Sequence, residues 1–123
     1  MDEPRHALVI EDDADSRVLF VEMLTDCGME SVAVAHHELP GAREFTVVVT
    51  DLPRPRARYS SAAAVAWVNQ LAWAYRAPVV VVTGNTEAAH DTRLREVAAH
   101  VIQKPLDMDE FIDRVTAAAA APR

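Results

Sequence analysis

Three short apolar runs constrain the fold of this chain most strongly, because each one ends at a polar side chain. Residues 47–50 are Val-Val-Val-Thr, and Asp51 and the helix-breaking string Leu52-Pro53-Arg54-Pro55 follow them. A β-branched run that ends in this way is typical of a buried parallel strand carrying a carboxylate at its carboxyl end. Parallel α/β sheets place their chemistry at that edge. The two similar runs are residues 7–10, before Glu11-Asp12-Asp13, and residues 79–82, before Thr83-Gly84.

Helical patterns alternate with these strand patterns along the chain. Apolar residues at the spacing of one buried helical stripe follow the first strand, and Gly28 is a suitable C-terminal stop for that helix. A long helix is predicted over about residues 60–76, and shorter or weaker strands over residues 31–35 and 100–103. The two core stripes are Phe20, Met23, Leu24 and Cys27 in the first helix, and Val68, Leu71, Ala72 and Tyr75 in the long helix.

Three further helices complete the pattern. A crossover helix is expected over residues 36–45, where Pro40-Gly41 makes it short or degenerate. Another helix opens at Thr86-Glu87, with Leu94, Val97 and Ala98 facing inward. The last helix begins near Met108 and places Met108, Phe111, Ile112 and Val115 on one face.

Five strands alternating with five helices predict an α/β fold with a doubly wound, five-stranded parallel sheet. Right-handed crossovers give the strand order 2-1-3-4-5 and a flavodoxin-like three-layer sandwich. The 123 residues fit a single domain, with a core of about residues 6–118 and an Ala-rich C-terminal tail that frays through Pro122-Arg123.

Composition narrows the classes of function. The net charge of −7 and the pI near 5.1 argue against a nucleic-acid-binding surface, which needs a basic face. Cys27 is the only cysteine, so the chain has no intramolecular disulfide, and its place in a helical stripe predicts a small core residue. The N-terminus lacks the pattern of a signal peptide and no apolar run approaches the roughly 20 residues of a membrane span, so the expected location is the cytoplasm.

The predicted topology brings the acidic residues together. The ends of the first and third strands lie side by side, so Glu11, Asp12 and Asp51 should converge in one crevice. Carboxylates about 4 Å apart repel by about 4 kcal/mol per pair at an effective dielectric near 20, so the cluster requires a proton or a cation. Magnesium suits it best, because Mg²⁺ uses one or two carboxylates together with water and phosphate oxygens.

The fourth and fifth strands add Thr83 and Lys104 to the same edge. A hydroxyl and an ammonium beside a metal-bound carboxylate are what a transferring phosphoryl group needs, because catalysis there is mostly positioning and charge neutralisation. Gly84 leaves the approach to Thr83 open, and Asp51 would be the nucleophile that forms an aspartyl phosphate.

This set of residues resembles the signature of response-regulator receiver domains, the phosphoacceptor modules of two-component signal transduction. The matching features are the acidic pair Glu11-Asp12, Asp51, Thr83 and Lys104-Pro105, each after its own strand. The match runs from Ala7 to about Ala118. In this family the proline of the Lys-Pro pair follows a cis peptide bond.

The resemblance implies a role for each residue. Asp51 would accept the phosphoryl group, Asp12 would bind Mg²⁺ (or Mn²⁺) directly and Glu11 through water, and Pro53 would offer the metal its main-chain carbonyl. The phosphoryl oxygens would be bound by Thr83 and Lys104.

The resemblance also implies a function and partners. The phosphoryl group would come from a phosphohistidine of a histidine kinase or a phosphotransfer protein and would leave by slow autodephosphorylation. The chain would thus be a signalling domain rather than a turnover enzyme, with a downstream protein partner. The sequence leaves open homodimerisation, and whether the domain stands alone or belongs to a longer regulator or hybrid kinase.

Two departures from the family pattern affect signal transmission. Val101 stands three positions before the lysine, where family members usually carry an aromatic residue that responds to phosphorylation. The loop of residues 54–59 is Arg-Pro-Arg-Ala-Arg-Tyr in place of the usual Pro-Gly-Met-Asp-Gly-like stretch. Its arginines could be solvated, or could contact an acidic partner or a phosphoryl donor.

Three other functions compete with the receiver. The departures favour a phosphorylation-independent interaction module that keeps the site but signals by binding alone. A haloacid dehalogenase-like phosphatase needs a second aspartate two residues after the nucleophile, where this chain has Pro53, and it places its acid pair last. A flavodoxin-like nucleotide binder needs a phosphate-cradling loop, which none of the three glycines forms.

Two aromatic or histidine features have ordinary explanations. Trp73 lies opposite the core stripe of the long helix and should be exposed, whereas Trp67 sits at the edge of the stripe and should be partly buried. His36-His37 lies on a loop and lacks a third ligand, so it is not expected to bind a metal.

Overall fold

Five parallel strands form the centre of the molecule in the computed structural model, which describes residues 5–41, 43–53 and 58–121. The strands are β1 (His6–Ile10), β2 (Glu30–Val34), β3 (Val47–Thr50), β4 (Val79–Thr83) and β5 (His100–Gln103). They form one sheet in the order β2-β1-β3-β4-β5, which confirms the predicted topology. β1 pairs with β2 on one side and with β3 on the other, so their carboxyl ends are neighbours.

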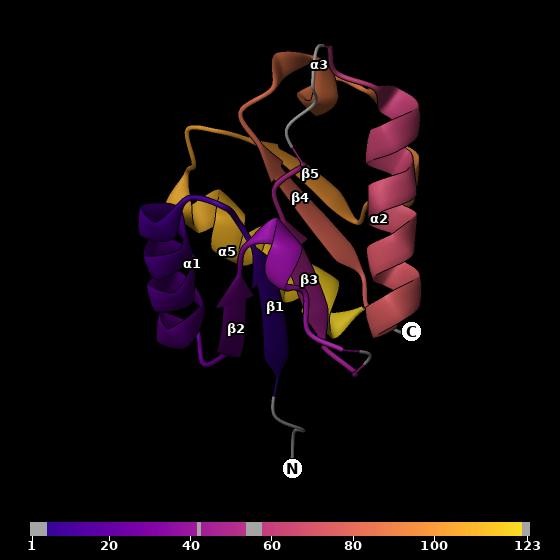
Figure 1. Ribbon diagram of the computed structural model, residues 1–123. Helices are drawn as coiled ribbons and strands as arrows, with labels where there is room; N and C mark the ends of the chain where they lie inside the picture. The colour runs from indigo at the N-terminus through magenta and orange to yellow at the C-terminus, as the bar shows by residue number, and fades with distance from the viewer. Residues whose placement is uncertain (1–4, 42, 54–57, 122–123) are drawn as a thin grey trace.

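Helices cover both faces of this sheet (Figure 1). Their bounds are α1 (Ala14–Asp26), a 3-10 turn η1 (His36–Glu38), α2 (Ser61–Tyr75), α3 (Thr86–Ala89), α4 (Thr92–Val97) and α5 (Met108–Ala120). Two hydrophobic clusters show the layering, because α1 and α5 pack on one face and α2 and α4 on the other.

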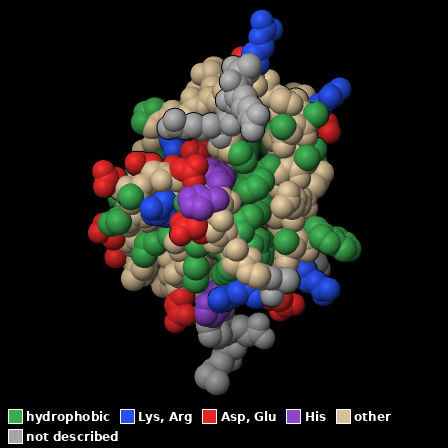
Figure 2. Space-filling model, viewed as in Figure 1, with side chains coloured by type: hydrophobic (Ala, Val, Ile, Leu, Met, Phe, Trp, Pro, Cys, Tyr) green, Lys and Arg blue, Asp and Glu red, His purple; other side chains and the backbone are tan. Residues whose placement is uncertain are grey.

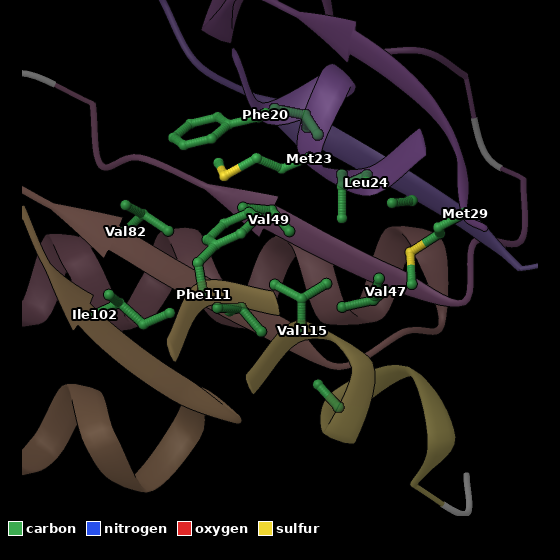
Figure 3. Packing of buried hydrophobic residues seen from close by; sticks show 14 residues of the cluster. Phe20, Met23, Leu24, Met29, Val47, Val49, Val82, Ile102, Phe111 and Val115 are labelled. Atoms are coloured by element: carbon green, nitrogen blue, oxygen red, sulfur yellow. The ribbon is translucent and has the colours of Figure 1, made fainter. Parts of the chain in front are cut away.

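The core explains why the strands read as continuous apolar runs. Successive strand residues point to opposite faces, so Val47 and Val49 meet α1 and α5, whereas Val48 meets α2. Figure 3 shows the first cluster, to which α1 contributes Phe20 and α5 contributes Phe111. Their rings stack with centroids 5.3 Å apart and an angle of 11° between the planes.

The helices begin and end where the sequence supplies caps. Asp13 is the N-cap of α1 and its carboxylate accepts a hydrogen bond from the Ser16 main-chain N–H. Gly28, just beyond α1, has φ of 83°, a conformation that favours glycine. The long helix matches its predicted bounds, Trp73 is 87% exposed, and Trp67 is partly buried, all as predicted.

The crossover between β2 and β3 is more degenerate than predicted. Within its described residues it contains only η1, and a loop that packs through Phe45 takes the place of the expected helix. The rings of Phe45 and Tyr75 of α2 form a T-shaped contact, with centroids 5.5 Å apart. The Tyr75 hydroxyl donates to the Pro40 carbonyl at 2.6 Å. Pro40-Gly41 stops a helix from continuing, and an aromatic contact supplies the missing cover.

The single helix predicted from Thr86 is wrong, because the chain divides into α3 and α4. Asp91 lies between them and caps α4, accepting hydrogen bonds from the main-chain N–H groups of Arg93 and Leu94. Leu94 and Ala98 are buried as predicted, but Val97, the last residue of α4, is 36% exposed.

Smaller core predictions also differ from the structure, since Ala72 and Ile112 are only partly buried. Met108 is 56% exposed, because it opens α5 one turn before the buried Phe111. Cys27 is only partly buried, and it packs against the edge of the first cluster. Pro122-Arg123 and its predicted fraying lie outside the described residues.

The stacked aromatic pair predicts a large contribution to stability. Replacing the fully buried Phe111 with alanine should lower the free energy of unfolding by about 3–5 kcal/mol, through lost burial and the cavity that remains. Met108→Ala on the same helix is the matched control and should change it by less than about 0.5 kcal/mol. Urea unfolding of both variants measures this, and a Phe111→Ala cost below about 1 kcal/mol would contradict the packing described.

Candidate functional site

The carboxyl ends of four strands meet at one edge of the sheet. Glu11 and Asp12 follow β1, Asp51 follows β3, Thr83 ends β4, and Lys104 follows β5. Glu11 and Thr83 are almost fully buried, whereas the Asp51 side chain is 24% exposed and that of Asp12 is 52% exposed. The acids and the lysine therefore meet as the topology requires, with Asp12 at the rim and Glu11 at the base.

Lys104, the only lysine of the chain, joins two of these carboxylates. Its Nζ lies 3.3 Å from Glu11 Oε2 and 3.3 Å from Asp51 Oδ2. The Lys104 main-chain N–H donates to the Thr83 carbonyl at 2.8 Å, which fixes the start of the side chain beside β4. The Lys104-Pro105 peptide is cis, as the family resemblance implied.

This arrangement couples the charges of its members. Burial raises the pKa of Glu11 above its ordinary value, and the negative charge of Asp51 raises it further. Burial acts to lower the pKa of Lys104, but the carboxylates of Asp51 and Glu11 outweigh it and raise that pKa. The ammonium is therefore held charged between the carboxylates of Asp51 and Glu11.

The Asp51 main chain and carboxylate are held from several directions. Its N–H donates to the Ile10 carbonyl at 2.9 Å, which continues the pairing of β1 with β3. The Leu52 N–H donates to Asp51 Oδ1 at 2.7 Å, so Oδ1 is held by the main chain while Oδ2 faces Lys104. The Asp51 carbonyl accepts hydrogen bonds from the Thr50 hydroxyl at 2.5 Å and from His36 Nε2 at 3.1 Å.

His36 contacts the site although the sequence pattern gave it no role. Its main-chain N–H donates to Asp12 Oδ1 at 2.8 Å, and its Nδ1 lies 2.8 Å from Asp12 Oδ2. The His36 N–H holds the pKa of Asp12 below its ordinary value. The feature of the sequence that could have identified His36 is its position just beyond β2. Because β2 neighbours β1, the residues after the two strands lie close together. Figure 2 shows histidine side chains beside acidic ones on this face.

Two cavities share Asp51 and Leu52. One of about 420 Å³ is acidic and is also lined by Glu11, Asp12, Asp13 and His36. The other, of about 380 Å³, is mainly apolar and lies between the loops after β3 and β4, with Thr83, Gly84 and Pro53 in its wall. The Thr83 hydroxyl accepts a hydrogen bond from the Asn85 N–H at 3.0 Å. Asp51 thus stands between a charged cavity and an apolar one.

The acidic cavity suits a hard divalent cation by the chemistry of its donors. Its carboxylate oxygens are the ligands that Mg²⁺ prefers, and an open cavity leaves room for the waters that this ion keeps. Within the described residues, no three acidic, histidine or cysteine side chains are already arranged as a metal cage. Asp12 instead pairs with His36, and Lys104 occupies the space between Glu11 and Asp51. Pro53 lines the other cavity, and its carbonyl as a metal ligand stays a prediction.

The loop after Asp51 is described only in part. Arg54 and Arg56 of the predicted basic patch lie outside the described residues, and Arg58 is exposed. Tyr59 donates from its hydroxyl to Asp91 at 2.6 Å, and burial raises the pKa of that hydroxyl. The loop is therefore joined to the start of α4, a contact that the sequence did not indicate.

The fold is that of known signalling domains. A CheY-like response regulator receiver domain from Methylobacillus flagellatus is similar to this chain with a TM-score of 0.69 and 22% identity, covering 94% of this chain and 99% of that one. The non-phosphorylated HemR receiver domain from Leptospira biflexa gives a TM-score of 0.75 and 22% identity, with 97% of each chain covered. The chain has the fold of a response-regulator receiver domain.

A third receiver-fold protein was solved with bound ions. The response regulator TrrA from Thermotoga maritima, in complex with Mg²⁺ and BeF, has a TM-score of 0.68 and 16% identity, covering 93% of this chain and 98% of that one. Protein-family models gave no match to the sequence, and neither did curated proteins. No helix among the described residues is long and apolar enough to cross a membrane.

The lysine bridge predicts a pH-dependent loss of stability. In Lys104→Met the pKa of Glu11 should rise further, because the neighbouring positive charge is lost. A carboxyl group whose pKa is higher in the folded than in the unfolded state lowers the stability of the protein as the pH rises above the ordinary value of 4.5. The variant should be less stable than the natural chain by about 1–3 kcal/mol near neutral pH, with a smaller deficit near pH 5.

Urea unfolding at the two pH values measures this difference. Lys104→Arg keeps the positive charge and should recover most of the deficit. An equal deficit at both pH values would show that Lys104 acts through packing and not through charge.

Proposed function

We propose that this chain is a phosphoacceptor signalling module in which Asp51 receives a phosphoryl group from a phosphohistidine of a histidine kinase or a phosphotransfer protein. The observation that carries the proposal is the Lys104 ammonium at 3.3 Å from Asp51, at the edge where the acidic cavity meets the threonine-lined one. A mobile phosphoryl group needs a nucleophilic oxygen, a fixed cation and a hydroxyl in this arrangement.

The transfer follows from the positions of the side chains. An Asp51 oxygen attacks phosphorus, the P–N bond to the donor imidazole breaks, and the ring nitrogen recovers its lone pair. Lys104 neutralises charge on the equatorial oxygens, and Thr83 can donate to one of them once its hydroxyl turns toward Asp51. Bound magnesium or manganese would supply further neutralisation of those oxygens through Asp12, Asp51 and, across water, Glu11.

The module then returns to its resting state by hydrolysis. Water attacks phosphorus, inorganic phosphate leaves, and the Asp51 carboxylate re-forms. We expect this step to be slow, because the mainly apolar wall of the second cavity offers few groups that could orient water on that side of Asp51. On this proposal the chain is a cytoplasmic signalling protein that is modified once per signal and does not turn over a substrate.

Intact-protein mass after incubation with Mg²⁺ and acetyl phosphate tests the proposal. The natural chain should gain the mass of one phosphoryl group, and Asp51→Asn should gain none. Asp26→Asn, at the last residue of α1, is the matched control and should be modified like the natural chain. Chelation of the cation should abolish the adduct, and Lys104→Met should slow its formation by about 100-fold.

Val101 favours a second candidate, an interaction module that signals by binding alone. Its half-buried side chain packs against the α2 cluster in the position where the family has an aromatic reporter. Folded, cation-bound protein that never gains phosphoryl mass would replace the first proposal with this one. Steady hydrolysis of phosphomonoesters would instead indicate a phosphatase, which Pro53 in place of a second aspartate disfavours.

A further inference from the structure

His36 makes contacts that neither the motif nor the proposed transfer requires. It opens η1 directly beyond the edge strand β2, and its side chain is only 14% exposed. The residue spans two loops, because its main-chain N–H binds Asp12 Oδ1 at 2.8 Å while its Nε2 lies 3.1 Å from the Asp51 carbonyl. His36 thus joins the Asp12 carboxylate to the main chain of Asp51.

The chemistry of the Asp51 contact fixes the role of Nε2. A carbonyl oxygen only accepts hydrogen bonds, so Nε2 carries the proton and donates it. Nδ1 is shielded from solvent and lies 2.8 Å from Asp12 Oδ2, and because a carboxylate oxygen also only accepts, this contact is a hydrogen bond only when Nδ1 carries a proton as well. Both ring nitrogens are therefore engaged by Asp51 and Asp12, and the ring acts by holding these two residues in place.

Other side chains hold the ring itself. The Trp67 ring packs against His36 with centroids 5.5 Å apart at an angle of 52°. Trp67 Nε1 donates to the Thr50 hydroxyl at 3.0 Å, and that hydroxyl donates to the same Asp51 carbonyl. The contacts run in a closed loop from the Asp51 carbonyl through His36, Trp67 and Thr50 back to that carbonyl.

We propose that His36 is the positioning residue of the cation site, tying the Asp12 loop to the Asp51 main chain before the ion binds. Residues that support a metal ligand lower the cost of ordering it, and their loss typically reduces metal affinity by about 10–100-fold. The main-chain N–H of His36 survives any substitution, so a substitution tests the contacts of the ring with the Asp51 carbonyl and with Asp12 Oδ2. This inference rests on the proposed cation-dependent function.

Direct binding of Mn²⁺ tests the role without any phosphotransfer step. Free Mn²⁺ is counted by electron paramagnetic resonance. His36→Ala should weaken the dissociation constant by about 10-fold. His37→Ala, the exposed neighbour in the same turn, is the matched control and should leave it unchanged.

Two amide variants separate the contacts of the ring. The amide nitrogen of Gln reaches about as far as Nε2, so His36→Gln should restore most of the affinity by donating to the Asp51 carbonyl. His36→Asn places its nitrogen near the position of Nδ1, so it should bind as weakly as His36→Ala. Rescue by Asn and not by Gln would overturn the assignment, because the route would then run through Asp12 alone.

The fluorescence of Trp67, which packs against His36, reports Mn²⁺ binding independently. In a Trp73→Phe background Trp67 is the only tryptophan, and Mn²⁺ should change its emission in the natural His36 protein and in His36→Gln. Equal or tighter Mn²⁺ binding by folded His36→Ala would overturn the inference and leave the proposed function standing. Absence of Mn²⁺ binding by the natural chain would overturn both.

Discussion

The rest of the site depends on one electrostatic constraint, the placement of two carboxylates at the buried ends of adjacent strands. Glu11 is 3% exposed, and without a cation its repulsion from Asp51 would act at short range in a poorly hydrated crevice. Carboxylates about 4 Å apart repel by about 4 kcal/mol at an effective dielectric near 20. Lys104 offsets this by lying 3.3 Å from both, and its main chain is fixed to β4. The β1, β3 and β5 ends are therefore bound into one charged unit.

Much of the fold and the site could be predicted, because buried parallel strands leave a clear trace in a sequence. Residues 47–50 and 79–82 are covered on both faces, so their apolar runs marked β3 and β4, and the polar residue after each run marked the functional edge. The crossover of residues 36–45 could not be placed, because its cover depends on Phe45 meeting Tyr75, a contact between distant segments. The break at Asp91 likewise depends on a capping geometry that a helical apolar pattern conceals.

His36 shows why a site residue can escape a motif. Within its own loop the pair His36-His37 has no third ligand, but β2, which precedes it, lies beside β1 in the sheet. The sheet order brings His36 against Asp12, and Trp67 of α2 holds it there. Tyr59 and Asp91 are a second example. The Tyr59 hydroxyl binds the Asp91 carboxylate, 32 residues away in sequence, and joins the loop after Asp51 to α4. A sequence pattern identifies the reacting residues more easily than it identifies the residues that hold them in place.

The most direct test of this account is the NMR titration of the single lysine. With ¹⁵N-labelled lysine the chain gives one side-chain resonance, from Lys104. The chemical shift of this resonance should change with the protonation of Glu11, at a pH above the ordinary glutamate value of 4.5. In Asp51→Asn the change should move to lower pH, because the negative charge that raises the pKa of Glu11 is removed. A shift that stays flat as the pH rises above 4.5 would contradict the bridge between Glu11 and Asp51.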